Sequence, residues 1–245
     1  MVIAVLADIV GSRKLDDRSA AQRILDEAIA RVEEHLPLAH HALTPTVGDE
    51  QQGVYLDLED AMVSLLMIQL ALPDGDHLDV TAVEGSDAWR HTAYGFVHDT
   101  EHALLAPLEV GEAMDVSFRA PWDGQFDQAG VFVRTDDEHW IKAGVEYADG
   151  HLGLGAVVTD IRSDWSVGYA DDWHGSEITV RVSRWPDAVI VRARAHDGEW
   201  RLVRVAPFDG EATASAGPFL AGPTRSGLVV RFTRWTRSAA DVALH

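Results

Sequence analysis

The stretch from Leu78 to Leu244 lacks helical periodicity, and this constrains the fold more than any other feature of the sequence. Its apolar residues fall in short runs spaced by turns, among them LDVTAV, MDVSFRA, AGVFVRT, EITVRVSRW, AVIVRARA and SGLVVRFTRW. Short, regularly spaced strands with turn signals between them are typical of an all-β sandwich or barrel. Asp197-Gly198 adds a strong signal for a tight hairpin. The sequence therefore predicts an all-β domain over residues 74–245.

Residues 1–73 follow a different pattern, in which strand-like runs alternate with helical periodicity. Val2–Ala7 is a short, continuous apolar run, typical of a strand covered on both faces. Apolar residues recur at three- and four-residue steps over Ser19–Leu36, where Ser19 is the candidate N-cap, and over Glu59–Leu72, which predicts two helices. Two short strands flank GDEQ between them. The predicted order is β-α-β-β-α, and the turn-rich PDGDH separates this α+β domain from the all-β domain.

The formal net charge is −20, from 20 Lys and Arg against 40 Asp and Glu. Such a surface repels nucleic acids and anionic membranes, so we expect neither as a partner. The chain has no cysteine, which excludes disulfides, cysteine-bound zinc and a catalytic thiol. MVIAVLADIV lacks the basic start of a signal peptide, and Asp8 interrupts it after too few apolar residues for a membrane span. We therefore expect a cytoplasmic protein.

DQAGVFVRTDDEHWIKAGVEY, over Asp127–Tyr147, predicts a hairpin in which a strand that is otherwise apolar carries a lysine and a glutamate. A five-residue polar turn sets the register, with Arg134 opposite Trp140, Phe132 opposite Lys142, Gly130 opposite Gly144, and Gln128 opposite Glu146. Strand side chains alternate between faces. One face of the hairpin is then apolar, and the other carries Gln128, Phe132, Arg134, Trp140, Lys142 and Glu146.

A face that mixes aromatic and polar side chains suits a carbohydrate or another small polar ligand, because rings stack on sugar faces and polar groups bind hydroxyls. The chain has eight tryptophans, and exposed rings in a concave site favour binding. The alternative is a solvated sheet face with cross-strand ion pairs. The predicted ligand site has Gln128, Trp140, Lys142 and Glu146 at its centre, and Asp127, Asp164, Trp165, Trp89 and Arg90 at its rim. Asp127 and Asp164 have a structural alternative as turn formers, and Trp165 and Trp89 have one as core residues.

The segments DAWRHTAYGF, DQAGVFVR, WIKAGVEY, VVTDIRSDWSV and HDGEWRLVRVAPF occur in this order and resemble the DUF1349 family. The resemblance covers about residues 74–236. That family belongs to the concanavalin A-like lectin/glucanase superfamily, so the resemblance implies a jelly-roll sandwich of two antiparallel sheets. It also implies a concave face of the kind that binds sugars in related families. The family brings no established reaction with it.

Glycoside hydrolysis through Glu146 is the alternative to binding. A retaining glycosidase needs two carboxyl groups about 5–5.5 Å apart, and glucanases of this superfamily place acids at alternate positions of one strand. Here Gly144 and Ala148 stand at those positions beside Glu146. Lys142 is four residues away, about 13 Å along a strand, and so is not a direct partner. These residues favour a non-catalytic binding protein over a hydrolase.

The N-terminal domain offers a candidate Mg²⁺ site. Asp8 ends the first predicted strand, and Asp49 lies at the tip of the hairpin that we expect beside it, with Glu50 as a weaker candidate. Two carboxylates that meet are stabilised by a cation, and oxygen ligands suit Mg²⁺. ADIVGSRKLDDR and GDEQQG resemble the SatD family over residues 1–72, matching only its N-terminal part, and the layout is similar to a nucleotide-cyclase palm or ferredoxin-like fragment. This implies a third function, Mg²⁺-nucleotide binding, while a hairpin turn explains the GDE sequence equally well.

Overall fold

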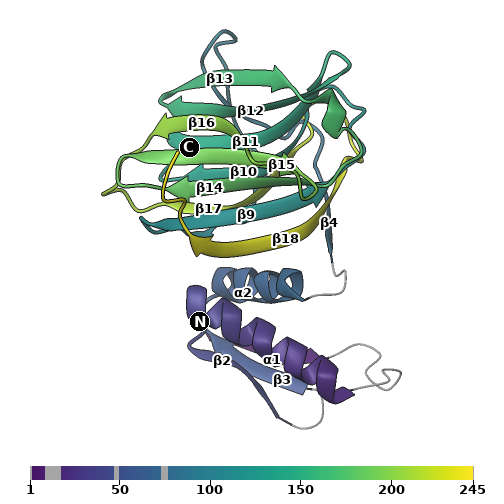
Figure 1. The fold of residues 1–245 in the computed structure, drawn as a ribbon, viewed down its shortest axis with the longest axis vertical. Helices are drawn as coiled ribbons and strands as arrows, with labels where there is room; N and C mark the ends of the chain where they lie inside the picture. Colours follow the sequence, from purple (N-terminus) through teal and green to yellow (C-terminus); the bar gives the residue numbers. More distant parts are fainter. Residues whose placement is uncertain (1, 9–17, 47–49, 73–76, 245) are drawn as a thin grey trace. The chain divides into compact units, whose positions relative to one another are not determined.

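The computed structural model describes residues 2–8, 18–46, 50–72 and 77–244 (Figure 1). The chain divides into two compact units, Met1–Asp76 and His77–His245. Each unit has its own sheets and is described separately.

The N-terminal unit is a three-stranded antiparallel sheet with two helices. In chain order its elements are β1 (Ile3–Asp8), α1 (Arg18–His35), β2 (His41–Pro45), β3 (Glu50–Tyr55) and α2 (Leu58–Ala71). The strand order is β1-β3-β2, so β1 lies beside the β2–β3 hairpin. α1 begins at Arg18, which places Ser19 inside the first turn rather than at the N-cap. Asp57 caps α2 by accepting a hydrogen bond from the Asp60 amide at 2.9 Å.

The C-terminal unit is a sandwich of two antiparallel sheets (Figure 1). The seven-stranded sheet contains, from one edge to the other, β13 (Arg162–Tyr169), β12 (His151–Asp160), β11 (His139–Ala148), β10 (Asp127–Arg134) and β17 (Ser215–Ala221), with β7 (His102–Ala103) and β8 (Ala106–Pro107) both paired to β17. The six-stranded sheet contains β16 (Arg201–Pro207), β15 (Ala188–Ala195), β14 (Ile178–Arg184), β9 (Glu112–Arg119), β18 (Val229–Ala239) and β4 (Leu78–Thr81). The predicted all-β architecture of this part of the chain is confirmed.

Period-two alternation builds the core between the sheets. Val131 and Val133 of β10 and Val116 and Phe118 of β9 are completely buried, and every second residue of these strands faces the opposite sheet. Trp235 of β18 fills the same layer and is 1% exposed. The intervening residues point to the outer faces of the sandwich, where the polar and charged side chains of the strands lie.

A separate two-stranded hairpin, β5 (Ala88–Arg90) and β6 (Val97–Asp99), lies against the outer face of the seven-stranded sheet. The Arg90 amide donates to Ser163 Oγ of β13 at 2.9 Å, and the Arg90 guanidinium binds Glu138 at 2.5 Å and the Ile161 carbonyl at 3.3 Å. These contacts hold the hairpin over the strands that carry the candidate site. Within the described residues, neither helix has both the length and the apolarity needed to cross a membrane.

Candidate ligand-binding site

The β10–β11 hairpin has the predicted register. Arg134 pairs with Trp140, Phe132 with Lys142, Gly130 with Gly144, and Gln128 with Glu146. The next strand continues these rows, with Val157 opposite Lys142 and Gly153 opposite Glu146. The side chains of these rows form one face of the seven-stranded sheet. We call it the cavity face and define it by Gln128, Phe132, Lys142, Glu146, Val157 and Trp165.

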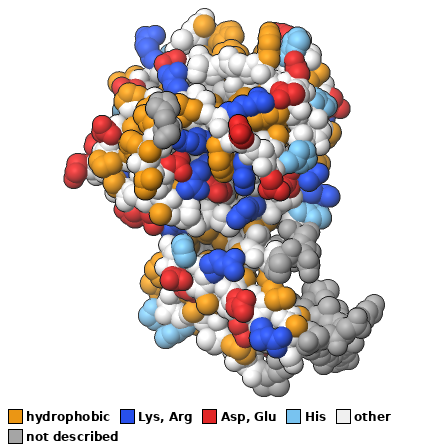
Figure 2. Space-filling view, in the orientation of Figure 1, with side chains coloured by type: hydrophobic (Ala, Val, Ile, Leu, Met, Phe, Trp, Pro, Cys, Tyr) orange, Lys and Arg blue, Asp and Glu red, His pale blue; other side chains and the backbone are white. Residues whose placement is uncertain are grey.

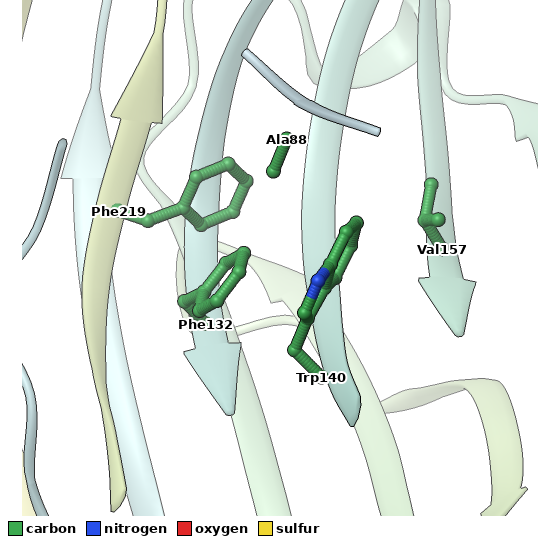
Figure 3. Packing of buried hydrophobic residues seen from close by; sticks show 5 residues of the cluster. All are labelled: Ala88, Phe132, Trp140, Val157 and Phe219. Carbon is green, nitrogen blue, oxygen red and sulfur yellow. The ribbon is translucent and has the colours of Figure 1, made fainter. Parts of the chain in front are cut away.

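An apolar cluster occupies one end of the cavity face (Figure 3). It contains Ala88, Phe132, Trp140, Val157 and Phe219, with Trp89 and Leu105 packed against it. The Trp140 ring stacks on Phe132, with the ring centroids 5.2 Å apart, and is only 4% exposed. Trp140 is therefore part of the packing beneath the hairpin. This corrects the prediction that its ring faces a ligand, since the segment that covers it lies about fifty residues earlier in the chain.

Lys142 is the centre of a buried polar cluster. Its ammonium donates to Asp87 Oδ1 at 2.9 Å and to Gln128 Oε1 at 2.8 Å, and Gln128 Nε2 donates to the same Asp87 oxygen at 3.2 Å. Asp87 also accepts the Ala88 amide at 2.8 Å. Lys142 and Gln128 are 5% and 3% exposed. A charge this buried is tolerated only when it is paired and hydrogen-bonded, and Asp87 provides that pairing from outside the sheet.

Glu146 lies on the same face and has no hydrogen-bond or ion-pair partner among the described residues. Burial raises the pKa of its carboxyl to about 6. Lys142 opposes this rise, and the negative charge of Asp87 adds to it. The cavity therefore contains one carboxyl group that is bound by a lysine and one that has no hydrogen-bond partner among the described residues. Two neighbouring carboxyl groups in such different surroundings are typical of a functional site.

Aromatic side chains form the walls of a cavity of about 380 Å³ above these polar groups. Trp89, Tyr94, Phe96 and His98 come from the β5–β6 hairpin, and Trp165 comes from β13. The Tyr94 and Phe96 rings stack with centroids 5.4 Å apart, and the Trp89 indole donates to the Thr92 carbonyl at 2.9 Å. Trp165 is 44% exposed. Rings are thus presented to the cavity and kept in place by local contacts.

Three of the predicted rim residues are held in structural contacts and do not line the cavity. Asp127 is completely buried and binds Arg225 at 2.6 Å. Asp164 binds Arg204 of the other sheet at 2.7 Å. Arg90 anchors the hairpin as described. Asp127 and Asp164 each precede a cavity-face residue by one position and so point to the opposite side of their strands, which the alternation already implies.

Six of the predicted residues meet at the cavity or its floor. Gln128, Lys142, Glu146, Trp89 and Trp165 line it, and Trp140 lies in the packed floor at one end. The predicted set lacks Asp87, Tyr94, Phe96 and His98. Tyr94, Phe96 and His98 occupy alternate positions of one apolar run, a pattern that places them on one face. That signal is in the sequence, whereas the contact between Asp87 and Lys142 is not.

The candidate Mg²⁺ site lies mostly outside the described residues. Asp49 is outside them altogether, and for Asp8 only the backbone is described, paired with Glu50 across β1 and β3. The Glu50 carboxylate accepts a hydrogen bond from Gln52 at 3.1 Å. Within the described part of the chain, no group of three or more His, Asp or Glu side chains is arranged to hold a metal ion. Mg²⁺-nucleotide binding by this unit stays a prediction.

The family described as protein of unknown function (DUF1349) matches residues 69–240. The chain belongs to the DUF1349 family. Regulation of enolase protein 1 of Saccharomyces cerevisiae is 37% identical over 165 residues, which cover 66% of this chain and 82% of the yeast protein. The crystal structure of a functionally unknown protein from Saccharomyces cerevisiae is 34% identical with a TM-score of 0.63, covering 66% of this chain and 88% of that one. The SatD-like resemblance of residues 1–72 stays a prediction.

More distant structures share the fold of the C-terminal unit. Bacteroides ovatus xyloglucan PUL GH43B has a TM-score of 0.53 at 11% identity, covering 69% of this chain and 34% of that one. A xylan β-1,4-xylosidase from Bacillus halodurans C-125 has a TM-score of 0.53 at 10% identity, covering 66% of this chain and 33% of that one. At these identities the likeness concerns the β-sandwich alone, because fold does not carry function with it.

Proposed function

We propose that this chain is a non-catalytic binding protein for a small polyhydroxylated ligand, such as a single sugar unit, held in the cavity of the seven-stranded sheet. The observation that supports it most is the arrangement of hydrogen-bonding groups. Lys142, Gln128, Asp87 and Glu146 lie together on a surface walled by aromatic rings.

The hydrogen bonds within the protein leave capacity for a ligand. An ammonium group has three donors, and Lys142 uses two of them on Asp87 and Gln128. Both carboxyl oxygens of Glu146 are without a protein partner among the described residues. A ligand hydroxyl donates and accepts at once, so it matches a donor and an acceptor that share one face. A purely apolar ligand would leave these groups unsatisfied, at a cost of about 1–3 kcal/mol for each.

The walls of the cavity supply the apolar half of the recognition. Trp165 and Phe96 are 44% and 42% exposed, and such rings gain free energy when a ligand covers them. The volume of about 380 Å³ lies within the range of about 300–1,000 Å³ for small-molecule sites. A concanavalin A-like jelly roll, as the resemblance implies, is part of this proposal. So is a cytoplasmic location, which the lack of cysteine supports.

The proposal is tested by an NMR titration of the full chain with a panel of monosaccharides, following the indole N–H signals. A ligand in the cavity should shift the signals of Trp165 and Trp89 in a saturable way and leave that of the buried Trp235 unchanged. Trp165→Ala should weaken binding at least about 10-fold, as expected for the loss of a stacking ring. Tyr169→Ala is the matched control, because Tyr169 is on the same strand, is 77% exposed and does not line the cavity. Equal effects of the two substitutions would contradict the proposal.

Glycoside hydrolysis is the second candidate, and the two carboxyl groups of the cavity favour it. A glycosidase needs one protonated and one ionised carboxyl. Burial raises the pKa of Glu146 to about 6, which suits a general acid. The second carboxyl group of the cavity is that of Asp87, which accepts hydrogen bonds from Lys142 and Gln128. Glu146→Gln should then abolish release of reducing sugar while binding persists. Release that survives this substitution would exclude the hydrolase.

A further inference from the structure

The outer face of the six-stranded sheet is rich in arginine, although the chain as a whole carries a charge of −20. We call it the arginine face and define it by Arg181, Arg192, Arg194 and Arg234. Lys and Arg side chains gather over this sheet in Figure 2, with acidic side chains among them. The four arginines fall in two neighbouring cross-strand rows, and the rows differ in how their guanidinium groups are used.

The first row is saturated by protein groups. Arg181 stands between Arg192 and Asp115 in the strand register. Its guanidinium binds Asp115 at 2.8 Å, Asp241 at 3.0 Å and the Ala239 carbonyl at 2.8 Å. Arg192 binds Asp241 at 3.3 Å and two carbonyls of the C-terminal segment. These arginines fasten the end of the chain to the sheet, and both terminal nitrogens of each guanidinium group are bound.

The second row is open. It runs across four strands in the order Arg194, Thr179, Ser117, Arg234, with each residue paired directly to the next. Neither Arg194 nor Arg234 donates a side-chain hydrogen bond to any described residue, and Arg194 Nε is buried without a partner. Adjacent strands are about 4.8 Å apart, so the backbones of Arg194 and Arg234 lie about 14 Å apart, with the two hydroxyl-bearing residues between them.

The Ser117–Thr179 pair has one hydroxyl donor that is not used within the pair. Ser117 Oγ and Thr179 Oγ1 are 2.8 Å apart and buried. One hydroxyl donates to the other, and the second hydroxyl keeps its own O–H. The Arg194 guanidinium also lies over the Trp200 ring, 4.6 Å from its centroid, which holds its plane in one orientation. The row therefore contains one guanidinium group that is oriented by a ring and a second, Arg234, that forms no hydrogen bond with the described residues.

The acidic groups nearby are already bound. Glu177 binds Arg119 at 3.3 Å and accepts from Thr233 at 2.9 Å, and Asp115 is bound by Arg181. Burial raises the pKa of Asp115, and the charges of Arg181, Arg234 and Arg194 oppose that rise, so Arg234 and Arg194 both act on a carboxyl group of the neighbouring row. Neither Arg194 nor Arg234 forms an ion pair with a described residue.

We propose that Arg194, Arg234 and the Ser117–Thr179 hydroxyl pair form a site for a tetrahedral oxyanion of the phosphate type, either free or as the phosphoryl group of a small molecule. Guanidinium groups bind such oxyanions through paired N–H donors. The site lies on the opposite sheet from the cavity, so it does not depend on the function proposed above.

The test is an NMR titration of the full chain with inorganic phosphate at constant ionic strength, following the arginine Nε–H signals. Saturable shifts at Arg194 and Arg234 are expected. Arg234→Ala should weaken binding by about 10-fold or more, as for one charge-assisted contact. Arg231→Ala, on the same strand and already paired with Asp79 at 2.8 Å, should change it by less than about two-fold. Arg194→Lys should lose most of the affinity, since it keeps the charge without the planar fork.

Phenyl phosphate distinguishes the two sources of the oxyanion. Tighter binding than inorganic phosphate would support a phosphorylated small molecule, and equal or weaker binding would support the free anion. Non-saturable shifts, or equal losses in Arg231→Ala and Arg234→Ala, would overturn the proposal, because they would report only general attraction to surface charge. Circular dichroism of each variant confirms that the fold is retained in the comparison.

Discussion

Both outer faces of the sandwich carry charged residues in the middle of strands, but the two faces differ in what surrounds those residues. On the cavity face, the β5–β6 hairpin covers the sheet, so Lys142 is 5% exposed and paired with Asp87. On the arginine face, Arg181 and Arg192 bind the C-terminal segment, whereas Arg194 and Arg234 donate no side-chain hydrogen bond to any described residue. A charge without water must be matched within the protein, whereas a wet charge is screened. Whether a segment covers the sheet face, rather than the type of residue, therefore decides which charged side chains form buried ion pairs.

Substitution of Trp140 should give the largest loss of stability, and comparing it with substitution of Trp165 distinguishes the floor of the cavity from its wall. Trp140→Ala removes a buried ring from the cluster with Phe132 and Phe219, so it should lower the free energy of unfolding by about 3–5 kcal/mol. Trp165→Ala, at a 44% exposed ring, should cost far less. Urea denaturation of the two variants measures this. A Trp140→Ala protein as stable as wild type would refute the assignment of Trp140 to the packed floor.

Lys142→Ala tests whether the covered ion pair is structural. The substitution leaves Asp87 and Gln128 without their shared partner, and breaking a buried pair in this way costs about 3 kcal/mol of unfolding free energy. Lys142→Met is the matched variant, because it keeps the aliphatic stem and loses the same charge. Both variants should be destabilised in urea. Wild-type stability in both would show that the pair is as weak as a surface contact.

Glu146 gives an effect that depends on pH. Its pKa is about 6 in the native chain, against 4.5 for an unburied glutamate, so the native state binds the proton more tightly. Stability contributed by the protonated carboxyl is present below about pH 4.5 and is lost as the pH rises through about 6. The difference is about 2 kcal/mol. Relative to wild type, Glu146→Gln should therefore gain about this much between pH 4 and pH 7.5.

The control for Glu146→Gln is its own pH profile. A constant offset from wild type at all pH values would reflect only a change in packing or hydrogen bonding. Unfolding free energies from urea curves at four or five pH values separate the two cases. A flat difference would contradict the raised pKa.

Arg231→Ala should give the smallest change in stability, because it removes an exposed ion pair of the six-stranded sheet. Arg231 and Asp79 form an ion pair with side chains 49% and 40% exposed, and such pairs contribute little to stability. The urea midpoint should stay within error of wild type, and added salt should not change that result. A large loss would show instead that this exposed pair is needed to hold β4 on the sheet.

The β-sandwich and the β10–β11 register follow from the sequence, because period-two alternation and a short polar turn are local signals. The same alternation predicts that Gln128, Lys142 and Glu146 share a face. The identity of the segment that covers this face cannot be predicted from the sequence. Asp87 and Trp140 meet their neighbours through a hairpin that packs on β13, and no local pattern specifies such a contact. Trp140 therefore resembles a ligand-stacking ring in the sequence and is a core residue in the structure.

The most direct test of ligand binding in the cavity is a glycan array probed with the full chain, beside Trp165→Ala and Tyr169→Ala. We predict selective binding by the wild type, loss of that binding in Trp165→Ala, and retention in Tyr169→Ala. Absence of binding to every glycan, or equal binding by Trp165→Ala, would contradict the claim that the cavity is a site for a polyhydroxylated ligand.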